Sequence, residues 1–249
     1  MKILLVQFAG RGGSQLYTAQ LANALAKNHD VFVLLANHLW DDKYYNKNVK
    51  KICISAPPDY IKMFLLTLNP LTYLKIIKIV NEINPDVIHA TQDFPWTTLV
   101  LPFIKHYPVV VTDHDPCFHK GTKIDMKLYL GFSKLFMRKK SRAIIVHGKR
   151  LKSMLIRKGI PENKIFVLPH GNFSFYTKWK KEKIKEFKSV LFFGSISKYK
   201  GIEYLIEAEP FISSKIPDFK IVIAGSGDFK KYLNLIKILF FSYTSLFAF

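Results

Sequence analysis

A glycine-rich turn near the N-terminus, Gly10-Arg11-Gly12-Gly13-Ser14, is the first segment whose residue types could do chemistry. Glycine has no Cβ, so this backbone can approach a ligand closely, and a helix that begins at Ser14 directs unsatisfied N–H groups at an anion. Phosphate is the obvious candidate, and a tight strand-to-helix turn without a ligand is the alternative. The dinucleotide fingerprint G-x-G-x-x-G fits poorly, because Gln15 occupies the third glycine position and Asn37 ends the next strand without a carboxylate. An ordinary NAD site is therefore not indicated.

Side chains that bind metals or form disulfides show no favourable spacing. The histidine and acidic residues considered as zinc ligands are dispersed: His89, Asp93, His114 and His119. Cys53 and Cys117 lie far apart and outside any C-x-x-C pair, so neither a cysteine zinc site nor a disulfide framework is indicated. We therefore predict no metal site and a reducing, cytoplasmic environment.

The chain is strongly basic. Lys and Arg number 38 against 18 Asp and Glu, which gives a formal net charge of +20. This excess favours phosphate-bearing partners, whether nucleotides, nucleic acid or an anionic membrane surface, and charge alone does not choose among them. The apolar stretch MFLLTLNPLTYLKIIKIV is interrupted by Asn69, Pro70 and Lys75, so it falls short of the ~20 apolar residues of a membrane-spanning helix.

Strand-like runs alternate with helix-length segments through the first two thirds of the chain. The predicted strands are KILLVQF, DVFVLLA, KKICIS, DVIHA, PVVVTDH, RAIIVHG and KIFVLPHG. This alternation predicts βα units and a mostly parallel sheet. The first helix is predicted to pack on the sheet through an apolar stripe of Tyr17, Leu21, Ala24 and Leu25, and a later helix is predicted to end before Asn84-Pro85.

A polar, basic segment separates this region from a second βαβ unit. We predict a linker at 173–188, a strand at 190–194, a helix from about Ile202 and a further strand, KIVIAG. The glycine turn Gly225-Ser226-Gly227-Asp228 follows that strand. Ligands of such folds bind at the carboxyl ends of the strands, so both halves offer a glycine turn at the ligand-binding edge.

Six segments occur in the order known from one enzyme family: FAGRGGSQLYTAQLANALAKNHDVFVL, NPDVIHATQDF, VVVTDHD, RAIIVHGKRLKSMLIRKGIPENKIFVLPHGN, VLFFGSISKYKGIEYLIEA and FKIVIAGSGD. Up to about Asp228 the chain resembles glycosyltransferase family 4, the retaining GT-B enzymes that use nucleotide sugars. The resemblance implies an α/β, GT-B-like fold with a complete N-terminal Rossmann-like domain at 1–172, the linker, and an incomplete second Rossmann-like domain at 189–249.

The resemblance also implies roles for residues of the first half. Gly12 and Gly13 would lie against the phosphate and sugar of the donor. His114 matches a histidine that lies near the sugar, where Asp113 or Asp115 would fix its tautomer. A loop-end histidine with a structural hydrogen bond is the alternative.

In the second half, Lys200 matches the lysine that stabilises the diphosphate leaving group, with a solvated surface lysine as the alternative. His170 and Gly171 are placed at the crossing between the domains, where a turn entering a linker is an equal alternative. Three further residues complete the predicted donor site: Ser195, Gly225 and Gly227.

The sequence departs from the family pattern in two places. Ser195 follows Gly194 where the family has Arg, so one phosphate contact is missing unless Lys198 substitutes. The acidic motif of the second domain, two spaced glutamates, is not found, because the chain ends KKYLNLIKILFFSYTSLFAF. We expect no further βα units in this tail. We favour the end of a disrupted coding frame over a hydrophobic helix or a membrane-surface anchor.

These observations predict a glycosyltransferase that moves a sugar from a nucleotide-sugar donor to a glycan or lipid-linked acceptor with retention. The donor is a substrate, so no cofactor is predicted. The segment KIDMKLYLGFSKLFMRKKSR suits anionic lipid headgroups, which favours a peripheral location on the inner face of the membrane; an ordinary core helix with a basic face is the alternative. A catalytically inactive truncated paralogue remains an alternative function. Nucleic-acid binding is a remote one, because no reading element is recognisable.

Overall fold

The computed structural model describes residues 1–10, 12–57, 59–118, 124–173, 176–177, 188–235 and 241–244. These fall into two compact units, the first containing the described residues up to 177 and the second those from 188 onward. The predicted linker at 173–188 lies largely outside the described residues.

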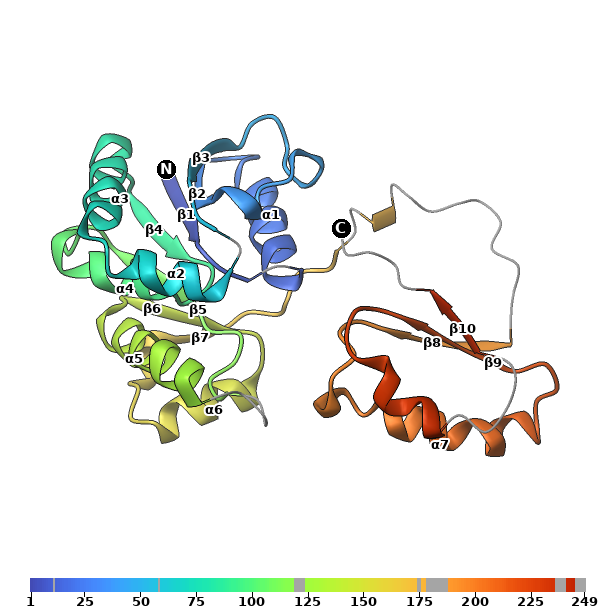
Figure 1. Cartoon of the computed structure of the whole chain (residues 1–249). Helices are drawn as coiled ribbons and strands as arrows, with labels where there is room; N and C mark the ends of the chain where they lie inside the picture. The colour runs from blue at the N-terminus through green and yellow to red at the C-terminus, as the bar shows by residue number, and fades with distance from the viewer. Residues whose placement is uncertain are drawn as a thin grey trace. The chain divides into compact units, whose positions relative to one another are not determined.

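The first unit is built on a seven-stranded parallel sheet with the order β3-β2-β1-β4-β5-β6-β7 (Figure 1). Its strands are β1 (Lys2–Gln7), β2 (Asp30–Ala36), β3 (Lys50–Ile54), β4 (Val87–Ala90), β5 (Val109–Thr112), β6 (Ala143–Val146) and β7 (Ile165–Val167). Every predicted strand of this region is confirmed. The order reverses between β1 and β4, which makes the carboxyl ends of these two strands the topological switch point, where ligands of doubly wound folds bind.

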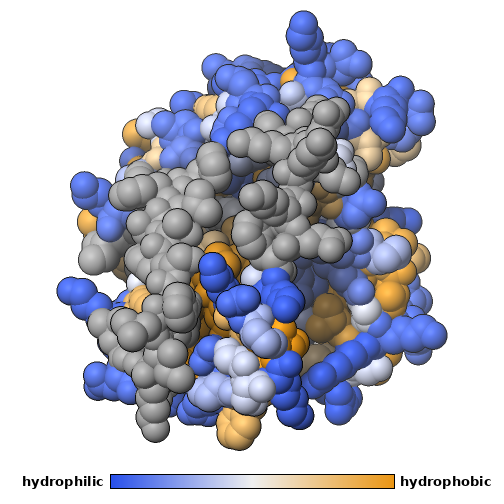
Figure 2. All heavy atoms as spheres, turned by 90° about the vertical axis from the view of Figure 1, so that its right-hand side faces the viewer, coloured by the Kyte–Doolittle hydropathy of each residue, from blue (hydrophilic) through white to orange (hydrophobic). Residues whose placement is uncertain are grey.

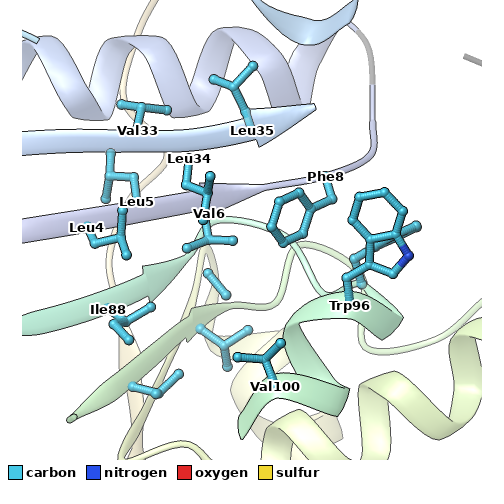
Figure 3. Close-up of a cluster of buried hydrophobic side chains, with 14 of the residues drawn as sticks. Leu4, Leu5, Val6, Phe8, Val33, Leu34, Leu35, Ile88, Trp96 and Val100 are labelled. Atoms are coloured by element: carbon cyan, nitrogen blue, oxygen red, sulfur yellow. The ribbon is translucent and has the colours of Figure 1, made fainter. Parts of the chain in front are cut away.

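Burial of the central strands on both faces explains why their sequences are almost continuously apolar. Leu4 and Leu5 of β1 and Leu34 of β2 have no exposed surface, and Phe8 continues this core beyond the end of β1. Figure 3 shows these side chains together with Trp96 of α4 (Pro95–Val100). The rings of Phe8 and Trp96 lie 5.2 Å apart at a tilt of 53°, so aromatic packing closes the core at the switch-point edge of the sheet.

Helices connect the strands of this unit. They are α1 (Gly13–Leu25), α2 (Tyr60–Thr67), α3 (Pro70–Ile83), α4, α5 (Ile124–Lys140) and α6 (Lys149–Arg157). The predicted end of α3 is confirmed: Asn84 caps the helix in the left-handed conformation, at φ 49°, immediately before Pro85. Within the described part of the chain, no helix combines the length and apolar character needed to cross a membrane.

The predicted apolar stripe of α1 is correct in part, because Leu21 and Leu25 are half-buried and pack against the core. The residues that α1 buries are Leu16, Thr18, Ala19 and Ala22, whereas Ala24 is exposed. The small side chains of Ala19 and Ala22 let the helix lie close to the sheet. Tyr17 is consequently turned towards the carboxyl edge of the sheet, where it contacts polar groups.

The second unit contains a three-stranded parallel sheet with the order β10-β9-β8. Its elements are β8 (Ser189–Phe193), a short 3-10 helix at Lys198–Lys200, α7 (Ile202–Ser213), β9 (Lys220–Ala224), a 3-10 helix at Phe229–Leu235 and β10 (Phe241–Thr244). Ile202 and Ile206 of α7 pack with Ile221 and Ile223 of β9 in a separate small core.

The tail was predicted to add no further βα units, and its described residues contribute one strand that was not predicted: β10 pairs in parallel with β9 from Phe241 to Thr244. An apolar segment gains backbone hydrogen bonds by covering an otherwise open sheet edge.

The face of the molecule in Figure 2 is predominantly hydrophilic with separate hydrophobic patches, as the basic composition predicts.

Candidate active site

The start of α1 lies at the switch point and is open to a ligand. Gly12 is the N-cap of the helix at φ 69°, and no described side chain caps it. The first N–H groups of an α-helix have no partner within the helix and carry its positive dipole end. Nothing lies within 4 Å of the position that a Cβ would take on Gly12 or Gly13. This combination leaves the helix start open to an anion, and binding of a phosphate there stays a prediction.

Gly10 serves the turn in a different way. Gly10 has a φ of 81°, and a Cβ added at this position would collide with the side chain of Gln92, which follows β4. The amide Nε2 of Gln7 donates to the carbonyls of Ala9 and Gly10 at 3.1 and 3.0 Å. The Gln7 amide thus ties down the turn after β1, and the side chain of Gln92 lies against Gly10.

Three histidines gather at the same edge of the sheet. His114 follows β5, His147 follows β6 and His170 follows β7. Nε2 of His147 lies 3.2 Å from Nδ1 of His114, and the ring centroids of His147 and His170 are 4.8 Å apart. The ring of Tyr17 packs against all three, at centroid distances of 4.8 Å to His114 and 5.3 Å to each of the others. We refer to His114, His147 and His170 as the histidine cluster.

Each ring of the histidine cluster is oriented by a backbone carbonyl. Nε2 of His114 bonds to the carbonyl of Thr91 at 3.1 Å, and Nδ1 of His147 bonds to that of Leu168 at 3.1 Å. Nδ1 of His170 bonds to the carbonyl of Gly171 at 2.8 Å. A carbonyl only accepts, so each of these nitrogens carries a hydrogen and donates it.

We predicted that Asp113 or Asp115 fixes the tautomer of His114. In the structure, the Thr91 carbonyl takes this role. The carboxylate of Asp113 is directed to Arg138 instead, with 2.7 Å between Oδ2 and Nε.

A buried hydroxyl network lies behind the cluster. The hydroxyl of Thr112 is 2.8 Å from Nε2 of His89 and 3.1 Å from the hydroxyl of Tyr17. Burial, with His114 as a smaller cause, lowers the pKa of His89 to about 4. Burial is also the main cause that lowers the pKa of His114 and of His147. These rings are therefore mostly neutral at pH 7, and a neutral ring can both donate and accept a hydrogen bond.

A buried ionic network supports the loop that carries His114. Besides its contact with Asp113, Arg138 of α5 donates through Nη2 to the carbonyl of Pro116 at 3.1 Å. Lys134, one turn earlier, donates to Oδ1 of Asp93 at 3.2 Å and to the carbonyl of Asp115 at 3.0 Å. The side chains of Asp113 and Arg138 are only 4% and 9% exposed. Helix α5 thus fixes both sides of His114 through charged hydrogen bonds.

The remaining predicted site residues belong to the second unit. Lys200 ends the 3-10 helix that follows β8, one residue before the N-cap of α7, and its Nζ lies 5.1 Å from the ring centroid of Tyr199. Ser195 is exposed in the loop after β8. Both lie beyond the carboxyl end of a parallel strand, where the sequence placed them.

Gly225 and Gly227 have a structural reason to be glycine. A Cβ on Gly225 would collide with the carbonyl of Gly194, and one on Gly227, at φ 145°, would collide with that of Ile196. The backbone N–H of Ile196 donates to the carbonyl of Ser226 at 2.8 Å, which brings the loops after β8 and β9 together. The close approach of two backbones accounts for both glycines without a ligand.

Sequence reasoning identified His114 and His170, and the structure brings them to one edge. Gly171 is exposed and serves as the acceptor for His170. The sequence missed His147. It could have been found from its position, because His147 stands at the carboxyl end of the predicted strand RAIIVHG, as His114 does in PVVVTDH.

Comparison with known proteins supports the fold and reveals the family. The structure of UDP-GlcNAc 2-epimerase from Neisseria meningitidis bound to UDP-GlcNAc aligns with a TM-score of 0.63 at 14% identity, over 99% of this chain and 73% of that one. The Anabaena protein HepE in complex with UDP-glucose aligns with a TM-score of 0.64 at 17% identity, over 98% and 70%. An uncharacterized glycosyltransferase of Methanocaldococcus jannaschii is 39% identical over 87 residues, which are 30% of this chain and 22% of that relative.

Two parallel α/β units, with an open helix start at the switch point of the first, correspond to the GT-B fold. The family model described as Glycosyltransferase Family 4 matches residues 11–171, and that of Glycosyl transferases group 1 matches residues 175–240. The chain belongs to glycosyltransferase family 4.

The buried ionic network provides a stability test. Asp113→Ala leaves the Arg138 guanidinium buried without its carboxylate, and we expect it to lower the free energy of unfolding by about 3–5 kcal/mol. Urea denaturation of the full chain measures this. Glu82→Ala, which breaks the exposed Lys78–Glu82 pair on α3, is the control and costs below about 0.5 kcal/mol. Equal losses in the two variants would refute the role given to Asp113.

Proposed function

We propose that this protein transfers a sugar from a nucleotide-sugar donor to a glycan or lipid-linked acceptor with retention at the anomeric carbon. The observation that carries the proposal is the open start of α1 at Gly12 and Gly13, which offers unsatisfied N–H groups and space to a phosphate beside His114. The solved structures with UDP or UDP-sugars that share the fold support a nucleotide sugar as the ligand.

His114 is proposed to orient the sugar of the donor. Its Nε2 is held by the Thr91 carbonyl, which leaves Nδ1 as the atom that accepts a hydrogen bond from a sugar hydroxyl. Tyr17 and the Arg138–Asp113 pair restrict the ring and its loop. A fixed acceptor lowers the entropy cost of placing the anomeric carbon for attack.

Lys200 is proposed to stabilise the leaving group. When the bond between the anomeric carbon and the phosphate oxygen breaks, the nucleoside diphosphate gains negative charge, and a cation placed there favours the transition state over the ground state. This chemistry requires no cofactor, and the donor itself is the substrate.

An exposed apolar surface suits a lipid-linked acceptor at a membrane. Exposed side chains lie along α2, the start of α3 and α5: Phe64, Leu65, Leu68, Leu71, Leu74, Ile124, Leu128, Phe132 and Leu135. The hydroxyls of Thr67 on α2 and Tyr129 on α5 are 2.7 Å apart, so the two helices are in contact. Lys127, Lys139 and Lys140 on α5 are exposed as well. We propose that this surface lies on the inner, anionic face of the cytoplasmic membrane.

The open helix start gives a direct binding test. Gly13→Leu fills the space at the start of α1, and we expect it to weaken nucleotide-sugar binding at least about 10-fold because the phosphate loses its N–H partners. Calorimetric titration with a panel of nucleotide sugars, UDP-glucose among them, measures the dissociation constant. Ala24→Leu makes a similar change at an exposed position of the same helix and leaves the constant unchanged. Unaltered affinity in Gly13→Leu would return the turn to a purely structural role.

Lys200 is tested by its effect on turnover. Lys200→Ala is expected to reduce the rate of transfer or of donor hydrolysis by about 100- to 1,000-fold, since it removes a charge used mainly in the transition state. The melting temperature stays unchanged because the side chain is exposed. Lys215→Ala, an exposed lysine after α7, is the matched control. Normal turnover in Lys200→Ala would exclude the residue from the mechanism.

The apolar surface is tested with vesicles that contain phosphatidylglycerol. Phe132→Glu is expected to lower vesicle binding at least about 10-fold, because it removes an exposed phenyl group that would insert into the membrane surface and adds a charge that anionic lipids repel. Phe103→Glu is the matched control, since Phe103 is 65% exposed and Phe132 60%. Sedimentation of protein with vesicles gives the partition coefficient at several salt concentrations. Equal loss in both variants would contradict a specific membrane-facing surface.

A further inference from the structure

In the histidine cluster, the ring nitrogens that face one another have no hydrogen between them. The far nitrogens of His114, His147 and His170 all donate to backbone carbonyls. In neutral rings the remaining nitrogens, Nδ1 of His114 and Nε2 of His147 and His170, therefore carry lone pairs. Two of these, on His114 and His147, lie only 3.2 Å apart. Two lone pairs at this distance repel each other. A cation that binds to both nitrogens removes this repulsion.

The spacing of the cluster suits a tetrahedral metal ion. With metal–nitrogen bonds of about 2.0–2.1 Å, the ligand nitrogens of such an ion are about 3.4 Å apart. The His114–His147 distance is close to this value, and ligand atoms of the three histidines all lie within 4.8 Å of one another. His170 is exposed and follows β7, so it borders solvent on the open side of the cluster. Three strand ends of one rigid sheet supply the ligands.

The surroundings match those of histidines that bind metals. A metal-bound histidine almost always donates its other N–H to a carbonyl or carboxylate, which fixes the ring and its tautomer. All three members of the cluster show this arrangement, although their carbonyl partners come from different segments, Thr91, Leu168 and Gly171. Tyr17 packs against all three rings and further limits their rotation.

We propose that His114, His147 and His170 bind one divalent transition-metal ion of the zinc class at the carboxyl edge of the first sheet. Three imidazoles without a carboxylate suit zinc, cobalt, nickel or copper and do not suit magnesium or calcium, which prefer oxygen ligands. Three protein ligands leave a fourth coordination position for water or an oxygen ligand.

The site has a regulatory consequence that rests on the proposed function. A metal ion bound to Nδ1 of His114 occupies the atom proposed to accept a donor hydroxyl. Metal binding and donor binding therefore compete, and each lowers the affinity for the other by the same factor.

The test uses the full chain, freed of metal with a chelator, at pH 7.5. Calorimetric titration with zinc sulfate is expected to give one ion per chain, and His147→Gln and His170→Gln are each expected to lower its affinity at least about 10-fold. Cobalt(II) replaces zinc as a spectroscopic probe and gives the intense visible absorption of a tetrahedral ion, which His147→Gln abolishes. His106→Gln changes an exposed histidine outside the cluster and is the control.

Unchanged zinc affinity in His147→Gln, or cobalt without the tetrahedral spectrum, would overturn the proposed site. The donor experiment separates this failure from that of the proposed function. UDP-glucose, or whichever nucleotide sugar binds, is titrated into the chelator-treated protein with and without zinc. Binding in the absence of zinc supports the donor site whatever the metal result, and a zinc-induced loss of affinity that disappears in His147→Gln supports competition. A zinc site that leaves donor affinity unchanged would refute the competition alone.

Discussion

The central position of β1 in a parallel sheet is the constraint on which the first unit depends. β1 is hydrogen bonded to β2 from Lys2 to Gln7 on one side and to β4 from Ile3 to Val6 on the other. The chain connects to these neighbours by crossovers in opposite directions, so the loops after β1 and β4 diverge at their carboxyl ends. The start of α1 lies at this switch point, and the histidine cluster, after β5, β6 and β7, contacts the same helix through Tyr17. The apolar character of β1 thus determines where polar chemistry is placed.

Local patterns were sufficient to predict most of the fold. The predicted strands of both units are present in the structure, because parallel strands buried on both faces have distinctive apolar runs. The predicted end of α3 at Asn84 was also correct. The buried face of α1 was predicted only in part: Leu21 and Leu25 pack against the core, but the fully buried residues include the small Ala19 and Ala22, which a search for large apolar residues overlooks. β10 was missed because this short strand lies in an apolar, aromatic tail and has no turn signal of its own.

The candidate site was only partly predictable. Gly12, Gly13 and His114 could be found because a turn or strand end marks each of them. The histidine cluster could not, because three residues spaced far apart in sequence meet only when β5, β6 and β7 are adjacent. The partners of these residues were also invisible: a carbonyl orients His114, and Asp113 serves Arg138. Neither a carbonyl partner nor a buried ion pair can be recognised from the spacing of residues in the sequence.

The crowding around Gly225 affects how mutational data on this family member should be interpreted. Since the Gly194 carbonyl occupies the space of any Cβ there, a saturation screen would score every replacement as harmful. Such intolerance would reflect two backbones in contact and would carry no information about ligands. Gly13 has open space around it and an ordinary helical conformation, so intolerance at that position is informative. Two glycines of equal apparent importance would thus report on different properties, one on architecture and the other on recognition.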